Sequence, residues 1–568
     1  MIRPVQMLQR VPCVVLAVLA ILPGCIVHAA PAPPSPIASA AVRNFLPSAY
    51  NAQRQNWAVV RDNRGTLYFG NTQGVLEFDG IRWRLIPLSG GRGAYALAKA
   101  ADGRILVGSE GEVGMLAPDQ NGSMRYVSTV GDLPAAFRSD QDRVIQIVDT
   151  PIGQVYLTDH WLIVKPPSGA LTALRSDDYF LRTAWFNGAL YVLDGVQGLT
   201  RLENGVQHGI PGGEGLRGLT MVVTKAGLLI PSFNEGMVLY APSASNPWQT
   251  PHIQDWTVAD GVDVTSAIAI EGDLLALGTA QHGLTLIDMK TGTLQRIGTA
   301  EGLGDAHVYS LYYDRAGSMW LALDNGISLV SLNLPKDPTA RPFIAWVRSV
   351  VGTRDERQVF GGTYFAHADG VQQLPQGPTQ LLKFPFKYNA FRIDYSADGL
   401  LATGHMEFQT YLKGVDTGWS TWSTRSEREF TELHPGKWNF EVRARKPTGE
   451  VSGEGSYRFE IDQVWYETWW FTVIQVAFVA TLLVISSHVK MSKRLEDGLT
   501  TFSVIVPFTY VSAALSSTIG HYSSGVVFFK VLMSSLLSFL LDPAKKQLKK
   551  GVQTRKATVV AKKVEKVV

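Results

Sequence analysis

Cysteine is nearly absent from this sequence. Its 568 residues include two, Cys13 and Cys25, and both lie in the first 25 positions. If that segment is removed, the mature chain has no thiol, which suits an exported protein because free thiols form wrong disulfides in an oxidising compartment. No thiol then remains to bind zinc, and the 11 histidines form no H-x-x-x-H or H-E-x-x-H pair. We therefore expect no metal site and no cofactor.

Charged residues are also few, at 18% of the chain, and they are unevenly distributed. The basic tail, residues 545–568, carries nine basic residues and one acidic residue, Glu565, for a net charge of +8. Because the whole chain carries +3, residues 1–544 carry −5, which argues against a nucleic-acid-binding body. Two interpretations of the basic tail stay open: it lies against anionic membrane lipid, or it is a solvated end.

The N-terminus has the pattern of an export signal. Arg3 and Arg10 precede an apolar stretch over residues 11–27. Residues 27–29 (Val-His-Ala) then offer small residues for cleavage. We predict a signal peptide over residues 1–29 and a mature chain that begins near Ala30. Residues 22–25 (Leu-Pro-Gly-Cys) loosely match a lipoprotein signal, which is the alternative.

Glycine, in contrast, is abundant, at 54 residues, and it marks an internal repeat. Asp62-Asn-Arg-Gly65 leads into the strand-like residues 67–71, and Asp314-Arg-Ala-Gly317 leads into residues 319–323. Weaker copies lie between these two. The second strands of the repeats are predicted to begin near Leu67, Ile105, Val155, Leu190, Leu228, Leu274 and Met319.

The spacing of these strands indicates the fold. The steps between them are 35 to 50 residues, the length of one four-stranded blade. One such sheet cannot bury both of its faces, whereas radial stacking on its neighbours does, and closing the ring limits exposed edges. We predict an all-β protein in which residues 40–335 form a seven-bladed β-propeller.

The last repeat also carries a family resemblance. Residues 308–329, Val-Tyr-Ser-Leu-Tyr-Tyr-Asp-Arg-Ala-Gly-Ser-Met-Trp-Leu-Ala-Leu-Asp-Asn-Gly-Ile-Ser-Leu, resemble the two-component-regulator propeller repeat, and residues 57–79 match it well. The central repeats depart from it, above all over residues 139–168, where Thr150-Pro-Ile-Gly153 replaces the D-x-x-G turn. The resemblance implies the extracytoplasmic sensor region of a hybrid two-component-type regulator.

After the propeller the pattern changes. From about residue 336 the blade period ends, and longer strands alternate with period two, as in residues 391–395 and 438–444. This pattern is typical of a β-sandwich.

Within that region, residues 411–416 (Tyr-Leu-Lys-Gly-Val-Asp), Trp419 and Trp438 resemble the three-Y domain. In the propeller sensor family this Ig-like module joins the propeller to a membrane helix. The resemblance implies an Ig-like β-sandwich over residues 336–462. We expect Tyr411, Trp419 and Trp438 to pack in its core rather than to form a ligand platform.

A membrane anchor is expected next. Residues 469–485 contain no charge, tryptophans crowd the front of this stretch, and basic residues follow it. We predict a transmembrane helix over residues 469–487, with the preceding domains outside the cytoplasmic membrane. Two shorter apolar stretches lie in residues 488–544. They form either a membrane hairpin or a replacement for a lost output domain, such as a histidine kinase or a diguanylate cyclase.

Several motifs look chemical but are weak. Residues 213–218 spell G-x-G-x-x-G, but no strand precedes them and no helix is expected after them, which favours a loop. Residues 119–122 (Asp-Gln-Asn-Gly) lack the ligand series of a calcium loop and are predicted to form a turn. No G-x-S-x-G elbow and no P-loop is present. We assign no catalytic, cofactor-binding, metal or ligand-binding residue from the sequence.

Together these patterns favour a sensor in the bacterial inner membrane whose propeller binds a periplasmic ligand, with no catalytic activity of its own. The family resemblance implies a ligand such as an oligosaccharide, on which Trp161, Trp185 or Trp256 could stack, although we expect each of these to pack inside a blade. Other partners would be membrane lipid and either a separate signalling protein or a second copy of the chain. Two alternatives stay open: the sensory half of a truncated histidine kinase or diguanylate cyclase, and an extracytoplasmic propeller enzyme acting on polysaccharide.

Overall fold

The computed structural model describes residues 40–463 except 177, 271–272, 335–338 and 363–380, and single helical positions between residues 470 and 558. Within residues 40–463 the chain is almost entirely β, with short helices α1 (Pro47–Tyr50), α2 (Ala135–Asp140) and α3 (Val258–Asp263). The predicted signal peptide and the apolar stretches after residue 498 lie outside the described residues.

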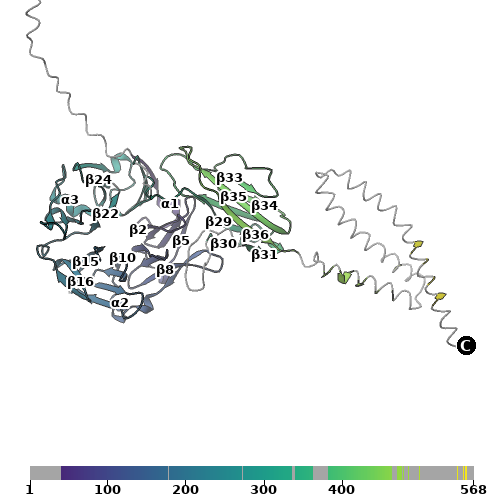
Figure 1. The fold of residues 1–568 in the computed structure, drawn as a ribbon, viewed down its shortest axis with the longest axis horizontal. Coiled ribbons are helices and arrows are strands. Elements are labelled where there is room, and N and C mark those ends of the chain that lie inside the picture. The colour runs from purple at the N-terminus through teal and green to yellow at the C-terminus, as the bar shows by residue number, and fades with distance from the viewer. Residues whose placement is uncertain are drawn as a thin grey trace, which may run out of the picture. The chain divides into compact units, whose positions relative to one another are not determined.

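Residues 40–332 form seven four-stranded antiparallel sheets, which we name sheets 1 to 7 (Figure 1). Sheets 1 to 6 each use four consecutive strands. Sheet 1 contains β2 (Asn56–Arg61), β3 (Leu67–Asn71), β4 (Gly74–Phe78) and β5 (Trp83–Ile86); sheet 2 contains β6 (Ala96–Lys99), β7 (Ile105–Gly108), β8 (Val113–Pro118) and β9 (Met124–Ser128); and sheet 3 contains β10 (Val144–Thr150), β11 (Gly153–Thr158), β12 (Trp161–Lys165) and β13 (Thr172–Arg175). Sheet 4 contains β14 (Phe180–Phe186), β15 (Ala189–Asp194), β16 (Gly198–Glu203) and β17 (Val206–Gly209); sheet 5 contains β18 (Val222–Val223), β19 (Leu228–Ser232), β20 (Gly236–Tyr240) and β21 (Trp248–Gln249); and sheet 6 contains β22 (Val264–Ile270), β23 (Leu274–Thr279), β24 (Leu284–Asp288) and β25 (Thr293–Ile297).

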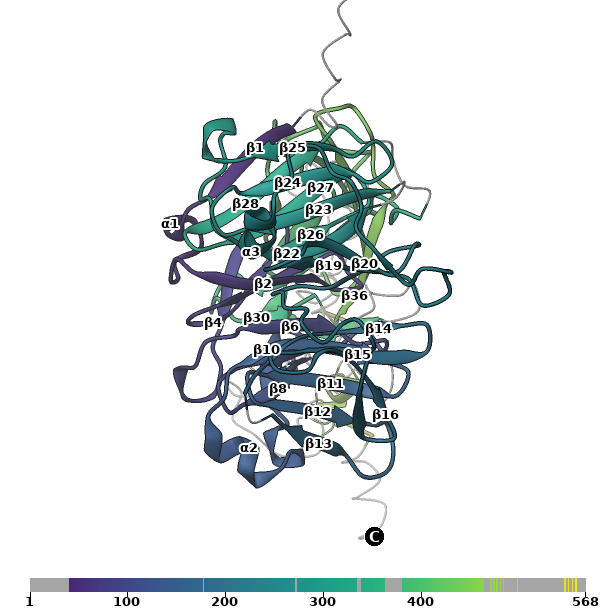
Figure 2. The same cartoon turned by 90° about the vertical axis from the view of Figure 1, so that its left-hand side faces the viewer.

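Sheet 7 joins the two ends of this region. Its strands β26 (Val308–Tyr313), β27 (Ser318–Leu323) and β28 (Gly326–Leu332) are completed by β1 (Ala40–Phe45), which pairs antiparallel with β28. The first strand of each sheet contacts the first strand of the next sheet, and β26 contacts β2 (Figure 2). The arrangement is therefore β-propeller-like, and the N-terminal strand holds the last sheet next to the first.

Hydrophobic clusters fill the spaces between successive sheets. One cluster joins sheets 7 and 1 through Phe45, Phe69 and Trp320, and each of the other neighbouring pairs shares a cluster of its own. Trp161 is buried in the cluster between sheets 2 and 3, and Trp185 and Trp256 pack against two others. Trp161 is thus a core residue, as expected, whereas Trp185 and Trp256 are half-buried, and all three pack between sheets rather than inside one sheet.

The predicted turns and second strands are present. Asp62 Oδ1 accepts hydrogen bonds from the backbone N–H groups of Arg64, Gly65 and Thr66 at 2.8 to 3.0 Å, which closes the D-x-x-G turn. Strands β3, β7, β11, β15, β19, β23 and β27 begin within two residues of the predicted positions. Residues 119–122 also form a turn, in which Asp119 Oδ1 accepts from the N–H groups of Asn121 and Ser123. Residues 213–218 lie in a loop, as predicted.

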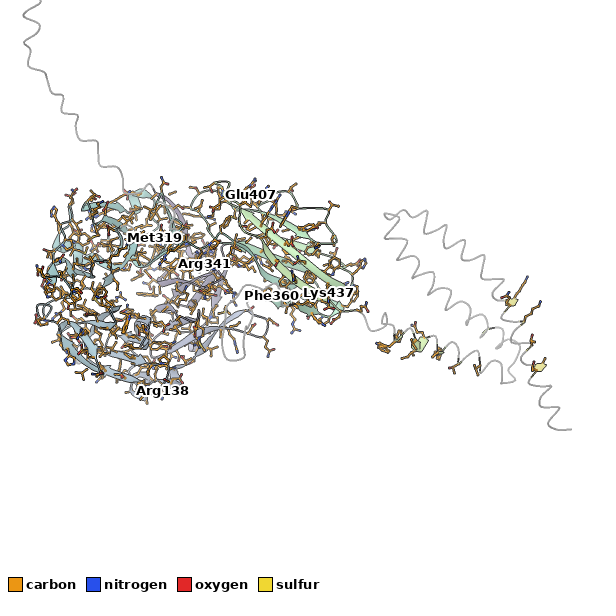
Figure 3. The ribbon with its side chains drawn as sticks, in the orientation of Figure 1. Arg138, Met319, Arg341, Phe360, Glu407 and Lys437 are labelled. Atoms are coloured by element: carbon orange, nitrogen blue, oxygen red, sulfur yellow. The ribbon has the colours of Figure 1, made fainter. Side chains whose placement is uncertain are left out.

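Two further four-stranded sheets follow, with strand orders β30-β29-β32-β34 and β31-β36-β35-β33. Their strands are β29 (Ala345–Gly352), β30 (Gln358–Phe360), β31 (Leu382–Phe384), β32 (Phe391–Ala397), β33 (Glu407–Leu412), β34 (Glu427–Phe430), β35 (Gly436–Arg445) and β36 (Gly455–Ile461). Tyr395 packs between Phe408 and Phe440, with ring centroids 5.3 and 6.0 Å away. Phe360, labelled in Figure 3, packs against Tyr457.

One expectation for this region is wrong. Tyr411, Trp419 and Trp438 are half-buried rather than part of the core. The rings of Tyr411 and Trp419 lie 5.9 Å apart, and the guanidinium of Arg443 covers Trp419 at 4.4 Å from its ring centroid. A cation can stabilise an aromatic face at the protein surface, so these side chains pack on the outside of their sheet.

The predicted transmembrane helix, residues 469–487, falls mostly on positions outside the described residues. The described positions from Trp470 to Val484 are helical. Among all described residues, no helix has both the length and the apolar character needed to cross a membrane.

Candidate functional site

A central cavity of about 630 Å³ lies among the innermost strands of the seven sheets. The first strands of sheets 1 to 4, 6 and 7 contribute residues to its wall, and the segment just before β18 of sheet 5 (Leu219, Thr220 and Met221) completes it. Lining residues include, in chain order, Trp57, Tyr95, Arg143, Ile145, Leu181, Arg182, Leu219, Thr265 and Tyr309. A cavity of this volume is large enough to enclose a small organic ligand.

A repeated backbone irregularity sets which side chains reach this cavity. The antiparallel register shifts near the start of β2, β10, β14, β22 and β26, where Trp57, Ile145, Leu181, Thr265 and Tyr309 are the extra residues. A β-bulge leaves its extra residue out of the ladder and redirects the side chain. All five of these residues line the central cavity.

Aromatic side chains and one arginine form a packed cluster on one part of the wall. The Trp57 ring lies 4.3 Å from Tyr309 and 5.4 Å from Tyr95, measured between centroids. The Arg143 guanidinium lies 5.3 Å from the Trp57 ring centroid and 5.4 Å from that of Tyr95, and His307 packs against Tyr309. Because the rings already pack on one another, this cluster shapes the cavity rather than offering a free face for stacking.

Both tyrosines of this cluster stay neutral in the folded protein. Burial raises the pKa of Tyr309 to about 12, and the hydrogen bond that its hydroxyl donates to Asp324, at 3.1 Å, adds to the rise. Burial also raises the pKa of Tyr95, and Glu110 acts in the same direction. A neighbouring carboxylate disfavours the phenolate, so these hydroxyls are suited to donate hydrogen bonds.

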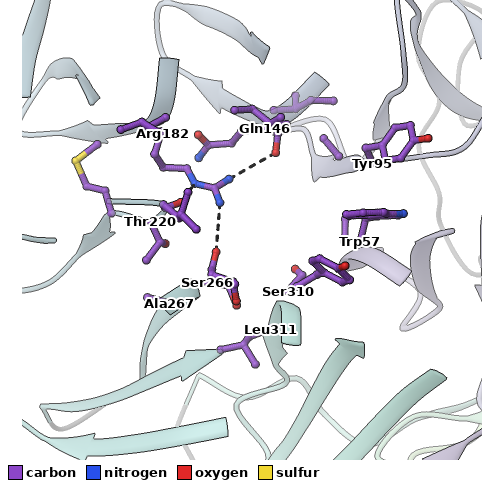
Figure 4. Close-up of a pocket in the computed structure, with 18 of the residues that line it drawn as sticks. Trp57, Tyr95, Gln146, Arg182, Thr220, Ser266, Ala267, Ser310 and Leu311 are labelled. Carbon is purple, nitrogen blue, oxygen red and sulfur yellow. Dashed lines mark hydrogen bonds between the residues drawn. The ribbon is translucent and has the colours of Figure 1, made fainter. Parts of the chain in front are cut away.

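Arg182 lies across the central cavity from Trp57 and Tyr95 (Figure 4). Its guanidinium contacts three backbone carbonyls: Nε donates to Leu219 O at 2.8 Å, Nη1 to Ile145 O at 3.5 Å and Nη2 to Thr265 O at 3.4 Å. These carbonyls belong to chain segments of three other sheets. Desolvation by burial lowers the pKa of Arg182 to about 10.

Carboxylates are scarce on this wall. Asp159 is the one acidic side chain among the residues that line the central cavity, and among the described residues no carboxylate oxygen lies within 4 Å of the Arg182 guanidinium. No group of three or more His, Cys, Asp or Glu side chains in the described part of the chain could hold a metal ion.

A second cavity, of about 280 Å³, lies between sheet 1 and strands β29 and β32, and several carboxylates line it. Five arginines line it, and each has a carboxylate partner at 2.6 to 2.9 Å: Arg64 with Asp62, Arg82 with Glu427, Arg84 with Glu77, Arg348 with Asp79, and Arg392 with Asp394. These charges compensate one another, so the second cavity is a set of ion pairs rather than a vacant charged site.

The sequence pointed to none of the residues of the central cavity, although one signal was available. Trp57 and Tyr309 each lie five residues before the aspartate of a D-x-x-G turn, and Ile145 lies five before Thr150, which takes the place of that aspartate. In these three repeats, the residue five positions before the turn is the one that the bulge redirects. Arg182 follows Leu181, which has the same place in β14.

Comparison with solved structures finds several that are similar to this chain. It is similar to the extracellular domain of the proposed hybrid two component system BT3049 from B. thetaiotaomicron, at 13% identity over 72% of this chain and 56% of that one, with a TM-score of 0.39. It is also similar to the extracellular domain of BT4673 from the same organism, at 14% identity over 75% and 60%, with a TM-score of 0.41.

The chain thus spans less than two thirds of the length of these two structures. Both are described as extracellular domains of hybrid two component systems. No protein-family model matches the sequence, and no curated protein does.

Proposed function

We propose that this chain is a membrane-anchored receptor that binds a small ligand in its central cavity and has no catalytic activity of its own. Sheets 1 to 7 would be the blades of a seven-bladed β-propeller, and residues 336–462 an Ig-like sandwich that passes the signal to a helix at residues 469–487. The region up to the helix would lie in the periplasm, and output would pass to a partner protein. The observation that carries the proposal is the central cavity, which is lined by the first strands of six sheets and by the segment just before β18 of sheet 5.

The sequence supports the location of this receptor. Residues 1–29 have the pattern of an export signal, and residues 469–485 are uncharged and followed by basic residues. The repeat and three-Y resemblances both belong to sensors with this arrangement. The structure adds a wall of redirected side chains, which is the kind of site that a rigid β scaffold presents to a ligand.

An enzyme is the second candidate, because tyrosines, a histidine and carboxylates gather around Trp57. Tyr309 with Asp324, Tyr95 with Glu110, and His307 could in principle form an acid–base group. However, a tyrosine acts as a general base only if its phenolate is accessible near the working pH. The raised pKa values of Tyr95 and Tyr309 disfavour that form, so the cluster is better suited to binding than to proton abstraction.

The test uses the full-length protein in detergent and a panel of small neutral, cationic and anionic compounds. A compound that binds should raise the melting temperature and slow amide hydrogen exchange at the start of β2, β10, β14, β22 and β26, because those segments line the central cavity. The variant Ser310→Trp, which fills the cavity, should lose this response.

The matched control is Ser139→Trp, at an exposed position of α2, which should bind like the unsubstituted protein. Failure of every compound to bind, or binding that persists in Ser310→Trp, would count against the proposal.

A further inference from the structure

Arg182 is held in an unusual way for an arginine of this protein. It lies just after the bulge at Leu181 in β14, and it extends into the central cavity (Figure 4). Buried Arg61 and Arg64, in contrast, each have an aspartate at 2.9 Å. The hydrogen bonds of Arg182 go to backbone carbonyls, which carry partial rather than full negative charge.

The three carbonyl contacts of Arg182 are not equivalent. The Nε–Leu219 O distance of 2.8 Å is that of a strong hydrogen bond, whereas 3.5 Å for Nη1 and 3.4 Å for Nη2 are at the upper limit of hydrogen bonding. The Nε bond therefore fixes the side chain. The two terminal nitrogens are held weakly and remain able to bind another acceptor.

The charge of this guanidinium is also poorly compensated. Arg182 is half-buried, and partial removal of a cation from water without an anionic partner lowers its pKa. At neutral pH the side chain still carries its proton, since a pKa of about 10 is well above 7. A protein keeps such a charge at a cavity wall at the expense of stability, and a bound anion would offset the loss.

We propose that Arg182 binds the oxyanion of the ligand, so that the ligand of the central cavity is a small organic anion. The end of the guanidinium formed by Nη1 and Nη2 matches the two oxygens of a carboxylate, phosphate or sulfate group. Nε keeps its bond to Leu219 O while the anion replaces the two long carbonyl contacts. Asp159 is more than 4 Å from the guanidinium, so it does not take this place. The inference rests on the proposed function, because it names the ligand class of the same site.

The experiment compares pairs of compounds that differ in charge: glucuronate with glucose, lactate with lactamide, and glycerol phosphate with glycerol, with sulfate alone as a further anion. Binding to the full-length protein in detergent is measured by calorimetry at low ionic strength. We expect the anion of at least one pair to bind about 10-fold or more tightly than its neutral counterpart. The carboxylate, phosphate and sulfate arms identify the oxyanion.

Substitution of Arg182 separates an anion site from a structural role. Arg182→Met should lose the preference for the anion, and its melting temperature should be unchanged or higher, because an uncompensated charge has been removed. Arg182→Lys should keep part of the preference. Arg138→Met, which removes an exposed arginine from α2, is the matched control and should leave binding unchanged.

The possible results each decide one question. Neutral compounds that bind the unsubstituted protein as tightly as their anions overturn this inference but leave the proposed receptor intact. Full anion binding by Arg182→Met overturns it too. If Arg182→Met is strongly destabilised, Arg182 is a structural link among three sheets, and the inference survives only if Arg182→Lys folds and binds the anion more weakly. If nothing in the panel binds, the proposed function itself fails.

Discussion

A single buried carboxylate organises each well-formed turn of the repeat. Asp314 is buried, and its Oδ1 accepts hydrogen bonds from the N–H groups of Ala316 and Ser318, both at 2.8 Å. Burial raises the pKa of Asp314 even though these bonds and Arg61 act in the opposite direction. The turn therefore depends on the oxygen acceptor, whereas the negative charge is a net cost.

Two substitutions at Asp314 separate these effects. Asp314→Ala should reduce the free energy of unfolding by about 1–3 kcal/mol, because two buried N–H groups lose their acceptor. Asp314→Asn keeps an oxygen acceptor and should be at least as stable as the unsubstituted protein at pH 7. Denaturant unfolding of each variant measures the difference, and Asp355→Ala, at an exposed turn, is a control expected to change stability by less than about 0.5 kcal/mol.

The difference in stability between the unsubstituted protein and Asp314→Asn should depend on pH. Because the folded-state pKa of Asp314 lies above the unfolded value, the folded state binds the proton more tightly, and stability rises as the pH falls through that window. Asp314→Asn lacks this titration, so its advantage should shrink between pH 7 and pH 4. An advantage that grows on acidification would show that the charge of Asp314 is stabilising.

At the scale of single residues, the sequence predicts turns that neighbouring residues close, but it does not predict contacts between residues that are far apart in the chain. The Asp62 and Asp314 turns were predictable because an aspartate and a glycine at fixed spacing close a turn without help from the rest of the chain. Arg182 was not, because its role depends on carbonyls of three other sheets. The core role expected for Trp419 also failed, because Arg443, 24 positions away in the chain, offers its ring a surface partner.

At the scale of elements, the contact between sheets 7 and 1 depends on one buried amide. Asn56 is fully buried, and its Nδ2 donates to Gly326 O at 2.9 Å, across 270 residues of sequence. Its Oδ1 accepts a hydrogen bond from Asn71 at 3.0 Å. Asn56 thus ties β2 to the start of β28, where β1 also pairs.

Asn56→Ala should reduce the free energy of unfolding by about 1–3 kcal/mol, because it leaves both the Gly326 carbonyl and the Asn71 amide without this partner. Denaturant unfolding of the full-length chain measures the change. Asn121→Ala, on an exposed turn, is the matched control and should have little effect. Equal stability of the two variants would mean that the hydrogen bonds of Asn56 contribute nothing to the contact between these sheets.

The sheets themselves were largely predictable as elements. Glycine-marked turns and alternating strands fixed the seven second strands to within two residues, because both signals are local. The bulges were not predictable, since a register shift is a property of two strands together. Their effect on the central cavity appears only when the sheets are side by side.

At the scale of the molecule, a buried ion pair links sheet 1 to the region that follows the seven sheets. Arg61 Nη2 lies 2.9 Å from Asp398 Oδ2, and both side chains are 8% exposed. Asp398 Oδ1 also accepts from the backbone N–H of Ile344. Arg341, labelled in Figure 3, adds hydrogen bonds to the Asp62 and Asn63 carbonyls. These contacts, together with the Arg348–Asp79 pair, hold sheet 1 against the region that follows.

Arg61→Met should reduce the free energy of unfolding by about 3–5 kcal/mol, because it leaves Asp398 buried without its cation. The double variant Arg61→Met/Asp398→Asn should recover part of the loss, since neither charge remains. Lys165→Met, which breaks the exposed pair with Asp132, is the control and should cost less than about 1 kcal/mol. Strictly additive effects of the two substitutions would show that the pair contributes no coupling.

The bulges on the inner strands also separate the residues that fold the protein from those that choose its ligand. An extra residue outside the ladder can be exchanged without breaking the strand pairs, although Leu181 and Ile145 also pack against the clusters between sheets. Trp57, Ile145, Leu181, Thr265 and Tyr309 already differ widely in chemistry at equivalent places. Relatives of this protein could therefore diverge to recognise unrelated molecules through a few substitutions, while the scaffold stays the same.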